Sequence, residues 1–88
     1  MSNLEALRSE IDQLDEKLIE LLAERFAVSR RVGKLKRSSV LPPRDEEREQ
    51  RQLQRVRGLA QAHGVSPELA EAVLRLIVDT VVVEHQEE

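Results

Sequence analysis

The feature that most constrains the fold is an apolar series along the first 35 residues, spaced alternately by three and four positions. It comprises Leu4, Leu7, Ile11, Leu14, Leu18, Leu21, Val28, Val32 and Leu35. This spacing is typical of a helix whose apolar seam packs against other helices. Because residues 4–37 contain no proline, they predict one continuous helix about 50 Å long, at 1.5 Å per residue.

A break that contains prolines separates this helix from a second one. Pro42 and Pro43 end the first helical pattern within residues 38–43, since proline lacks the backbone donor that a helix interior needs. The second helix is expected over about residues 44–63, with Gly64 as its C-cap.

The third helix has a clear start. Ser66 is a typical N-cap, and Pro67 suits the first helical position. The β-branched stretch at residues 77–83 could suggest a strand, but the caps and the lack of a partner strand favour a helix. The sequence therefore predicts one all-α domain of three helices over residues 1–88.

The two short helices cannot cover the whole length of the first. Much of the apolar seam would remain in water in a single subunit, so we expect an obligate helical homodimer in which the long helices pack together. The alternative is a bent first helix in a monomeric bundle.

Composition excludes several classes of function. The chain has no cysteine and one aromatic residue, Phe26, so it offers neither a thiolate zinc site nor a stacking surface for bases. Two histidines 22 positions apart, His63 and His85, predict no metal site. A net charge of −3 does not favour nucleic-acid binding. No membrane-length apolar run or signal-peptide pattern is found, so we expect a cytoplasmic protein without membrane contact.

Arg25 interrupts the apolar seam. A guanidinium is costly there unless an anion pairs with it. It could instead set the helix register or pair with an acid of the same chain. Lys36 lies about 16 Å further along nearly the same face, which leaves room for a small dianion between the two, although a lysine at a helix end is common. Arg8 lies about 25 Å before Arg25, so only an antiparallel partner could bring the two together.

The second helix carries a basic stripe formed by Arg44, Arg48, Arg51 and Arg55. By itself, such a stripe is typical of a solvated face held by ion pairs at i,i+4. The chain has no Ser/His/Asp constellation and no glycine-rich phosphate loop. Cations without a nucleophile suit the binding of a carboxylate-rich molecule, or a reaction that needs no nucleophile.

Three segments in this order, LRSEIDQLDEKLIELLAER, VGKLK and PPRDEEREQ, resemble the all-helical class of chorismate mutases. The resemblance covers nearly the whole chain. It implies an intertwined homodimer of three-helix subunits with two active sites, each taking an arginine from the partner's long helix. It also implies the Claisen rearrangement of chorismate to prephenate, on the route to Phe and Tyr, without a cofactor.

The resemblance assigns a role to each matching cation. Arg8 of the partner subunit and Arg25 would bind the two carboxylates of the substrate. Lys36 would donate to the ether oxygen and to a carboxylate, and Arg48 would border the ring. The substrate would then be the anion that Arg25 lacks.

The remaining site positions include two departures from the best-known members. Asp45 and Glu49 would address the ring hydroxyl. Val81 stands where a small hydroxyl residue is common, and His85 stands where a glutamine or an acid donates to the ether oxygen. Imidazole can also donate, but Gln86 next to it is a rival for this role.

Other functions stay open at this stage. A mutase acting on 4-amino-4-deoxychorismate and an isochorismate pyruvate-lyase are relatives on the same fold. A non-catalytic helical dimerisation or regulatory module is a third possibility. Such a module predicts an internal acid beside Arg25 and no pocket, whereas an enzyme predicts a closed cationic pocket lined by two chains.

Overall fold

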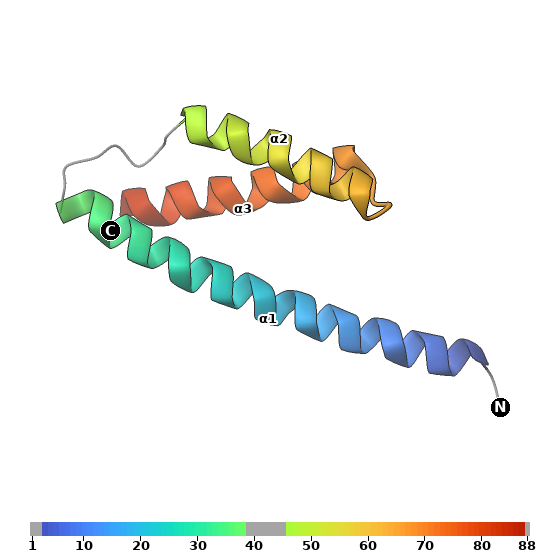
Figure 1. The fold of residues 1–88 in the computed structure, drawn as a ribbon. Coiled ribbons are helices and arrows are strands. Elements are labelled where there is room, and N and C mark those ends of the chain that lie inside the picture. The colour runs from blue at the N-terminus through green and yellow to red at the C-terminus, as the bar shows by residue number, and fades with distance from the viewer. Residues whose placement is uncertain (1–2, 39–45, 88) are drawn as a thin grey trace.

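The computed structural model describes residues 3–38 and 46–87, and within them the side chains of residues 3–35 and 46–84. These residues form three helices, α1 (Asn3–Ser38), α2 (Glu46–Ala62) and α3 (Pro67–Glu87), and no strand (Figure 1). The prediction of an all-α fold with one long and two shorter helices is confirmed. The predicted proline break at residues 38–43 lies outside the described residues, apart from Ser38, where α1 ends.

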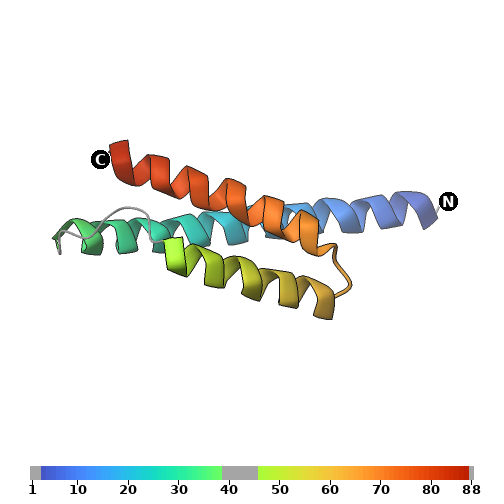
Figure 2. The same cartoon turned by 90° about the horizontal axis from the view of Figure 1, so that it is seen from above.

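Helix α1 is a continuous rod that extends well beyond the other two helices. Its 36 residues correspond to about 54 Å, and the molecule measures 59 × 25 × 15 Å. The N-terminal half of α1 projects away from α2 and α3 (Figures 1 and 2), and all of residues 3–21 are exposed. The bent helix of a monomeric bundle is therefore not adopted by this chain.

Helices α2 and α3 form an antiparallel hairpin that lies over the C-terminal half of α1 (Figures 1 and 2). The buried apolar side chains are Leu53 and Ala60 of α2 and Leu74 and Val82 of α3, so the core lies mainly inside the hairpin. Arg57 of α2 forms ion pairs across the hairpin with Glu71 at 3.3 Å and with Glu68 at 3.6 Å. A further ion pair, Arg30 with Glu84 at 3.8 Å, links α1 to α3.

The turn between α2 and α3 follows the predicted caps. Gly64 has a φ of 73°, a left-handed conformation that favours glycine, and the Val65 N–H donates to the Ala60 carbonyl at 2.8 Å. The Ser66 hydroxyl accepts a hydrogen bond from the Leu69 N–H at 3.1 Å, as an N-cap should. Both predicted caps are confirmed.

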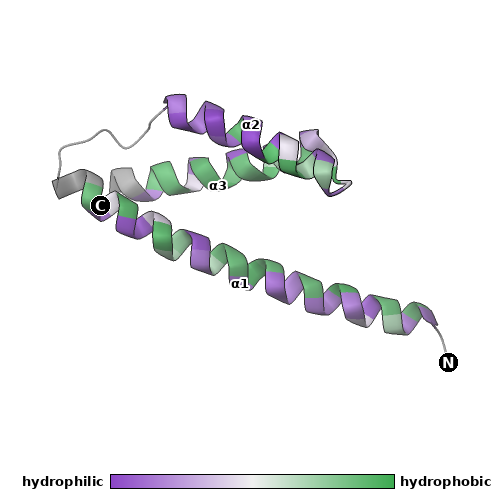
Figure 3. Cartoon of the chain, in the orientation of Figure 1, coloured by the Kyte–Doolittle hydropathy of each residue, from purple (hydrophilic) through white to green (hydrophobic). Residues whose placement is uncertain are grey.

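The apolar seam of α1 stays in contact with solvent within one chain. Figure 3 shows apolar residues along the side of α1 that is turned toward α3. Nevertheless Leu14 is 60% exposed, Leu18 55% and Leu35 68%. The hairpin is too short to cover a seam of this length.

Candidate active site

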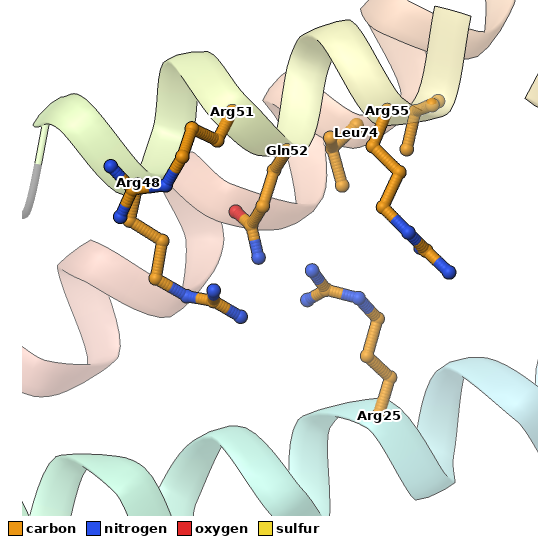
Figure 4. A pocket seen from close by; sticks show the side chains of 7 residues that line it. Arg25, Arg48, Arg51, Gln52, Arg55 and Leu74 are labelled. Carbon is orange, nitrogen blue, oxygen red and sulfur yellow. The ribbon is translucent and has the colours of Figure 1, made fainter. Parts of the chain in front are cut away.

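A pocket of about 370 Å³ opens between α1 and the α2–α3 hairpin. Helix α1 contributes one lining residue, α3 another, and α2 the remaining ones (Figure 4). The lining residues are Arg25, Arg48, Arg51, Gln52, Arg55, Val56 and Leu74. The pocket thus depends on how the hairpin sits on the long helix.

Side chains from opposite helices reach toward one another across this space. Arg25 extends from α1 toward α2, while Arg48 and Gln52 extend from α2 toward α1 (Figure 4). Arg48, Gln52 and Arg55 are spaced by four and three residues, which places them on one face of α2. Sequence spacing and helix packing together therefore bring the guanidinium groups to the pocket.

The pocket is strongly cationic. Four of the seven lining side chains that the structure describes are arginines and none of the seven is acidic, and a guanidinium stays charged at every physiological pH. Arg25 is half-buried and forms no ion pair with the residues that the structure describes. Arg51 makes a long contact of 4.0 Å with Glu47 one turn away. An arrangement of this kind attracts an anion, above all one with more than one carboxylate.

Among the residues that the structure describes, those lining the pocket offer no nucleophile and no pair of acid and base groups. A cluster of three or more His, Asp or Glu side chains that could hold a metal ion does not occur in the described residues. None of the described helices is both long and apolar enough to span a membrane. The described lining residues suit the binding of an anion and its electrostatic stabilisation by arginine.

The site residues predicted from sequence fall at different places. Arg25 and Arg48 line the pocket. Glu49, the residue after Arg48, is half-buried, and so is Val81 on α3, but neither is among the lining residues. Arg8 is exposed on the projecting part of α1, about 25 Å along the helix from Arg25, so it cannot reach the pocket of its own chain.

Four further predicted positions lie at or beyond the limits of the described side chains. Lys36 belongs to the last turn of α1, and His85 and Gln86 to the last turn of α3. Their side chains are outside the described set, and Asp45 is outside it altogether. Their proposed roles stay predictions.

Sequence reasoning missed several lining residues. Gln52, Val56 and Leu74 were not singled out, and Arg51 and Arg55 were noted only in a stripe typical of a solvated face. The structure shows these two arginines to be both exposed and at the edge of the pocket. The available signal was the spacing of Gln52 and Arg55 from Arg48, which puts them on the same face of α2.

Comparison with known proteins identifies the family. Residues 7–87 match the family model described as chorismate mutase type II. The T-protein of Haemophilus influenzae is 47% identical over 75 residues, which cover 85% of this chain and 20% of that protein. The bifunctional chorismate mutase/prephenate dehydratase of Escherichia coli is 41% identical over 81 residues, covering 92% and 21%.

A third relative is closer in length. The chorismate mutase of Methanocaldococcus jannaschii is 28% identical over 79 residues, which cover 90% of this chain and 80% of that protein. By contrast, the chain spans only about a fifth of the length of the T-protein and of the bifunctional enzyme. The family model extends over nearly the whole chain, across all three helices and the cationic pocket. The chain therefore belongs to the chorismate mutase type II family.

Proposed function

We propose that this chain catalyses the rearrangement of chorismate to prephenate, the precursor of Phe and Tyr. The observation that carries the proposal is the cationic pocket, in which the half-buried Arg25 has no acidic partner among the described residues. Chorismate carries two carboxylates and is therefore a dianion at neutral pH. Family membership supports the same reaction.

The reaction suits a pocket without a nucleophile. It is unimolecular, so the enzyme must hold the substrate in a chair-like conformer and stabilise negative charge on the ether oxygen as the C–O bond breaks. Arg25 binds one carboxylate and Arg48 borders the ring. Lys36 and His85 supply the hydrogen bonds to the ether oxygen, and Glu49 addresses the ring hydroxyl.

The active form is a homodimer in this proposal. Nine seam residues of α1 are between 43% and 68% exposed in the single chain, and a second copy packed antiparallel on α1 would cover them. The same arrangement brings Arg8 of the partner subunit to the pocket that contains Arg25. We also propose that residues 1–88 form a single chorismate mutase domain and that the protein acts in the cytoplasm.

The charge of the pocket also bears on the choice between an enzyme and a non-catalytic module. A non-catalytic module would need an internal acid beside Arg25, and the described residues provide none in contact with it.

One experiment distinguishes the candidate reactions. The protein is incubated separately with chorismate, isochorismate and 4-amino-4-deoxychorismate, and the products are followed by NMR. We expect prephenate from chorismate and no release of pyruvate from isochorismate. Turnover of the amino compound above that of chorismate would contradict the assignment, and no turnover of any substrate would leave the non-catalytic module.

A further inference from the structure

We propose that Arg55 captures the anionic substrate at the mouth of the pocket, an inference that rests on the proposed chorismate mutase activity. Arg55 lines the pocket, and its side chain extends from α2 toward α1 (Figure 4). The residue is exposed, and it forms no ion pair with the other residues that the structure describes. Its charge is therefore open to solvent at the point where a dissolved anion would enter.

Arg51 and Arg55 both line the pocket without a role in the proposed reaction, but they point in different directions. Arg51 runs along α2 and not toward α1 (Figure 4), and it approaches Glu47 to 4.0 Å. An acid beside an arginine cancels much of its attraction for an anion. Arg25 is half-buried on the opposite wall of the pocket. Arg55 is therefore an outer cation, which an arriving anion meets before it reaches Arg25.

The net charge of the chain gives a cation at the entrance a purpose. The chain carries a net charge of −3, so at long range it repels a substrate with two negative charges. At about 0.1 M salt, exposed charges interact over roughly 10 Å, so charges near the entrance act most strongly on an approaching anion. One guanidinium at this range raises the local concentration of a dianion about threefold. Arg55 thus offsets the repulsion from the rest of the chain where the substrate enters.

Capture by charge has a kinetic signature that distinguishes it from contact with the reacting atoms. An interaction that acts equally on the bound substrate and on the transition state changes KM and kcat/KM but leaves kcat unchanged. An attraction that acts through solvent also weakens as the salt concentration rises, whereas a buried ion pair is screened much less. The dependence of kcat/KM on ionic strength therefore reports the role of Arg55.

The test compares Arg55→Gln with the unchanged full chain in steady-state kinetics with chorismate. We expect kcat/KM of the unchanged protein to fall as salt rises from about 0.02 M to about 0.5 M. In Arg55→Gln, kcat/KM should be about threefold lower at low salt and should converge with the unchanged value at high salt, while kcat stays the same. Arg75→Gln is the matched control and should behave like the unchanged protein. Arg75 is an exposed arginine outside the pocket lining and is paired with Glu71 at 3.4 Å.

A second variant changes the charge at the entrance in the opposite direction. Glu47→Gln removes the acid beside Arg51, so kcat/KM at low salt should rise and should depend more steeply on salt. A loss in Arg55→Gln that is equal at every salt concentration, a fall in its kcat, or no change at all would overturn the capture role alone. An unchanged protein whose kcat/KM rises with salt would also overturn it, because the net charge would then dominate. If the unchanged protein does not convert chorismate at any salt concentration, the proposed function fails together with the role of Arg55.

Discussion

Arg25 stands where a charged side chain disfavours helix packing but where it can bind an anion. It occupies an apolar seam, where a charged side chain destabilises a helix interface unless an anion is present. The structure leaves it half-buried at a pocket whose other cations come from α2. In the proposed function, the dianionic substrate is the anion that removes this conflict. The interruption of the apolar pattern is thus what singles out Arg25 as a candidate binding residue.

Lys36 is predicted to stabilise the transition state more than the bound substrate. Lys36→Ala should lower kcat about 10²- to 10³-fold, as expected for the loss of one donor to a developing oxyanion. KM should change little, because the arginines provide most of the affinity for the two carboxylates. Steady-state kinetics with chorismate measures both constants, with Lys34→Ala, two positions earlier on α1 and exposed, as the control. Unchanged turnover in Lys36→Ala would remove Lys36 from the mechanism.

His85 and Gln86 compete for the second contact with the ether oxygen. If His85 donates, His85→Ala should lower kcat at least tenfold, which corresponds to about 1.4 kcal/mol of barrier. His85→Gln should retain much of the activity, since an amide also donates. Gln86→Ala should then behave like the unchanged protein. Kinetics of the three variants measured side by side decide between the residues, and a loss confined to Gln86→Ala would shift the assignment by one position.

For single residues, a charge that interrupts an apolar pattern can be recognised from the sequence as a candidate site residue. A polar residue that continues a polar pattern cannot. Arg25 was recognisable because an apolar position was expected there. Gln52 was not, because a polar residue within a basic stripe is typical of a solvated face. Whether such a residue lines a pocket depends on the rotation of α2 toward α1, and no local pattern encodes that rotation.

At the scale of elements, the ends of α2 and α3 were predictable because caps are local. Gly64 and Ser66 act through hydrogen bonds to residues within five positions of them. The backbone N–H of Glu68 and then the hydroxyl of Ser66 donate to the carboxylate of Glu68, with a further contribution from Arg57, and so lower its pKa. The cap hydrogen bonds need no tertiary context, whereas the contact of Arg57 with Glu68 and the packing of the hairpin on α1 do.

The two glycines of the hairpin should respond in opposite directions to alanine. Neither has an atom within 4 Å of where a Cβ would lie, so crowding plays no part. Gly64 has a positive φ of 73°, so Gly64→Ala should lower the free energy of unfolding by about 1–2 kcal/mol. Gly58 lies within α2, and Gly58→Ala should raise it by up to about 1 kcal/mol. Urea unfolding of both variants measures the difference, and equal effects would show that backbone conformation is not the cause.

At the scale of the whole molecule, one chain buries few apolar side chains and leaves the seam of α1 in solvent. The buried apolar side chains of the described residues are few and lie within or beside the α2–α3 hairpin, while the seam of α1 is exposed. The sequence predicts both the apolar seam and the need for a second surface to pack on it, because the periodicity and the length of the seam can be read along the chain. The way in which a second copy pairs with the seam depends on side chains from two surfaces at once.

Leu18 tests whether a second copy covers the seam. Its side chain is 55% exposed in the single chain, so Leu18→Asp would have little effect on a monomer. In the dimer the carboxylate is buried at an apolar interface, and we expect dissociation with loss of helical signal and of activity. Lys17→Asp, one position away, should remain folded. Sedimentation and circular dichroism at micromolar concentration measure both, and a folded, active monomer would contradict the dimer.

The final prediction concerns the sharing of each site by two chains. Arg8→Ala and Arg25→Ala subunits should each be inactive alone. After joint refolding in equal amounts, half of the dimers are mixed and each mixed dimer has one intact site, so activity should recover to about a quarter of the unchanged protein. The control mixes the unchanged chain with the Arg8→Ala/Arg25→Ala double variant. If the sites are shared, this mixture again retains about a quarter of the activity, because mixed dimers contain no intact site. If each site forms within one chain, every unchanged subunit keeps its site and about a half of the activity remains. The two mixtures together therefore show whether the 25 Å between Arg8 and Arg25 is bridged by the partner.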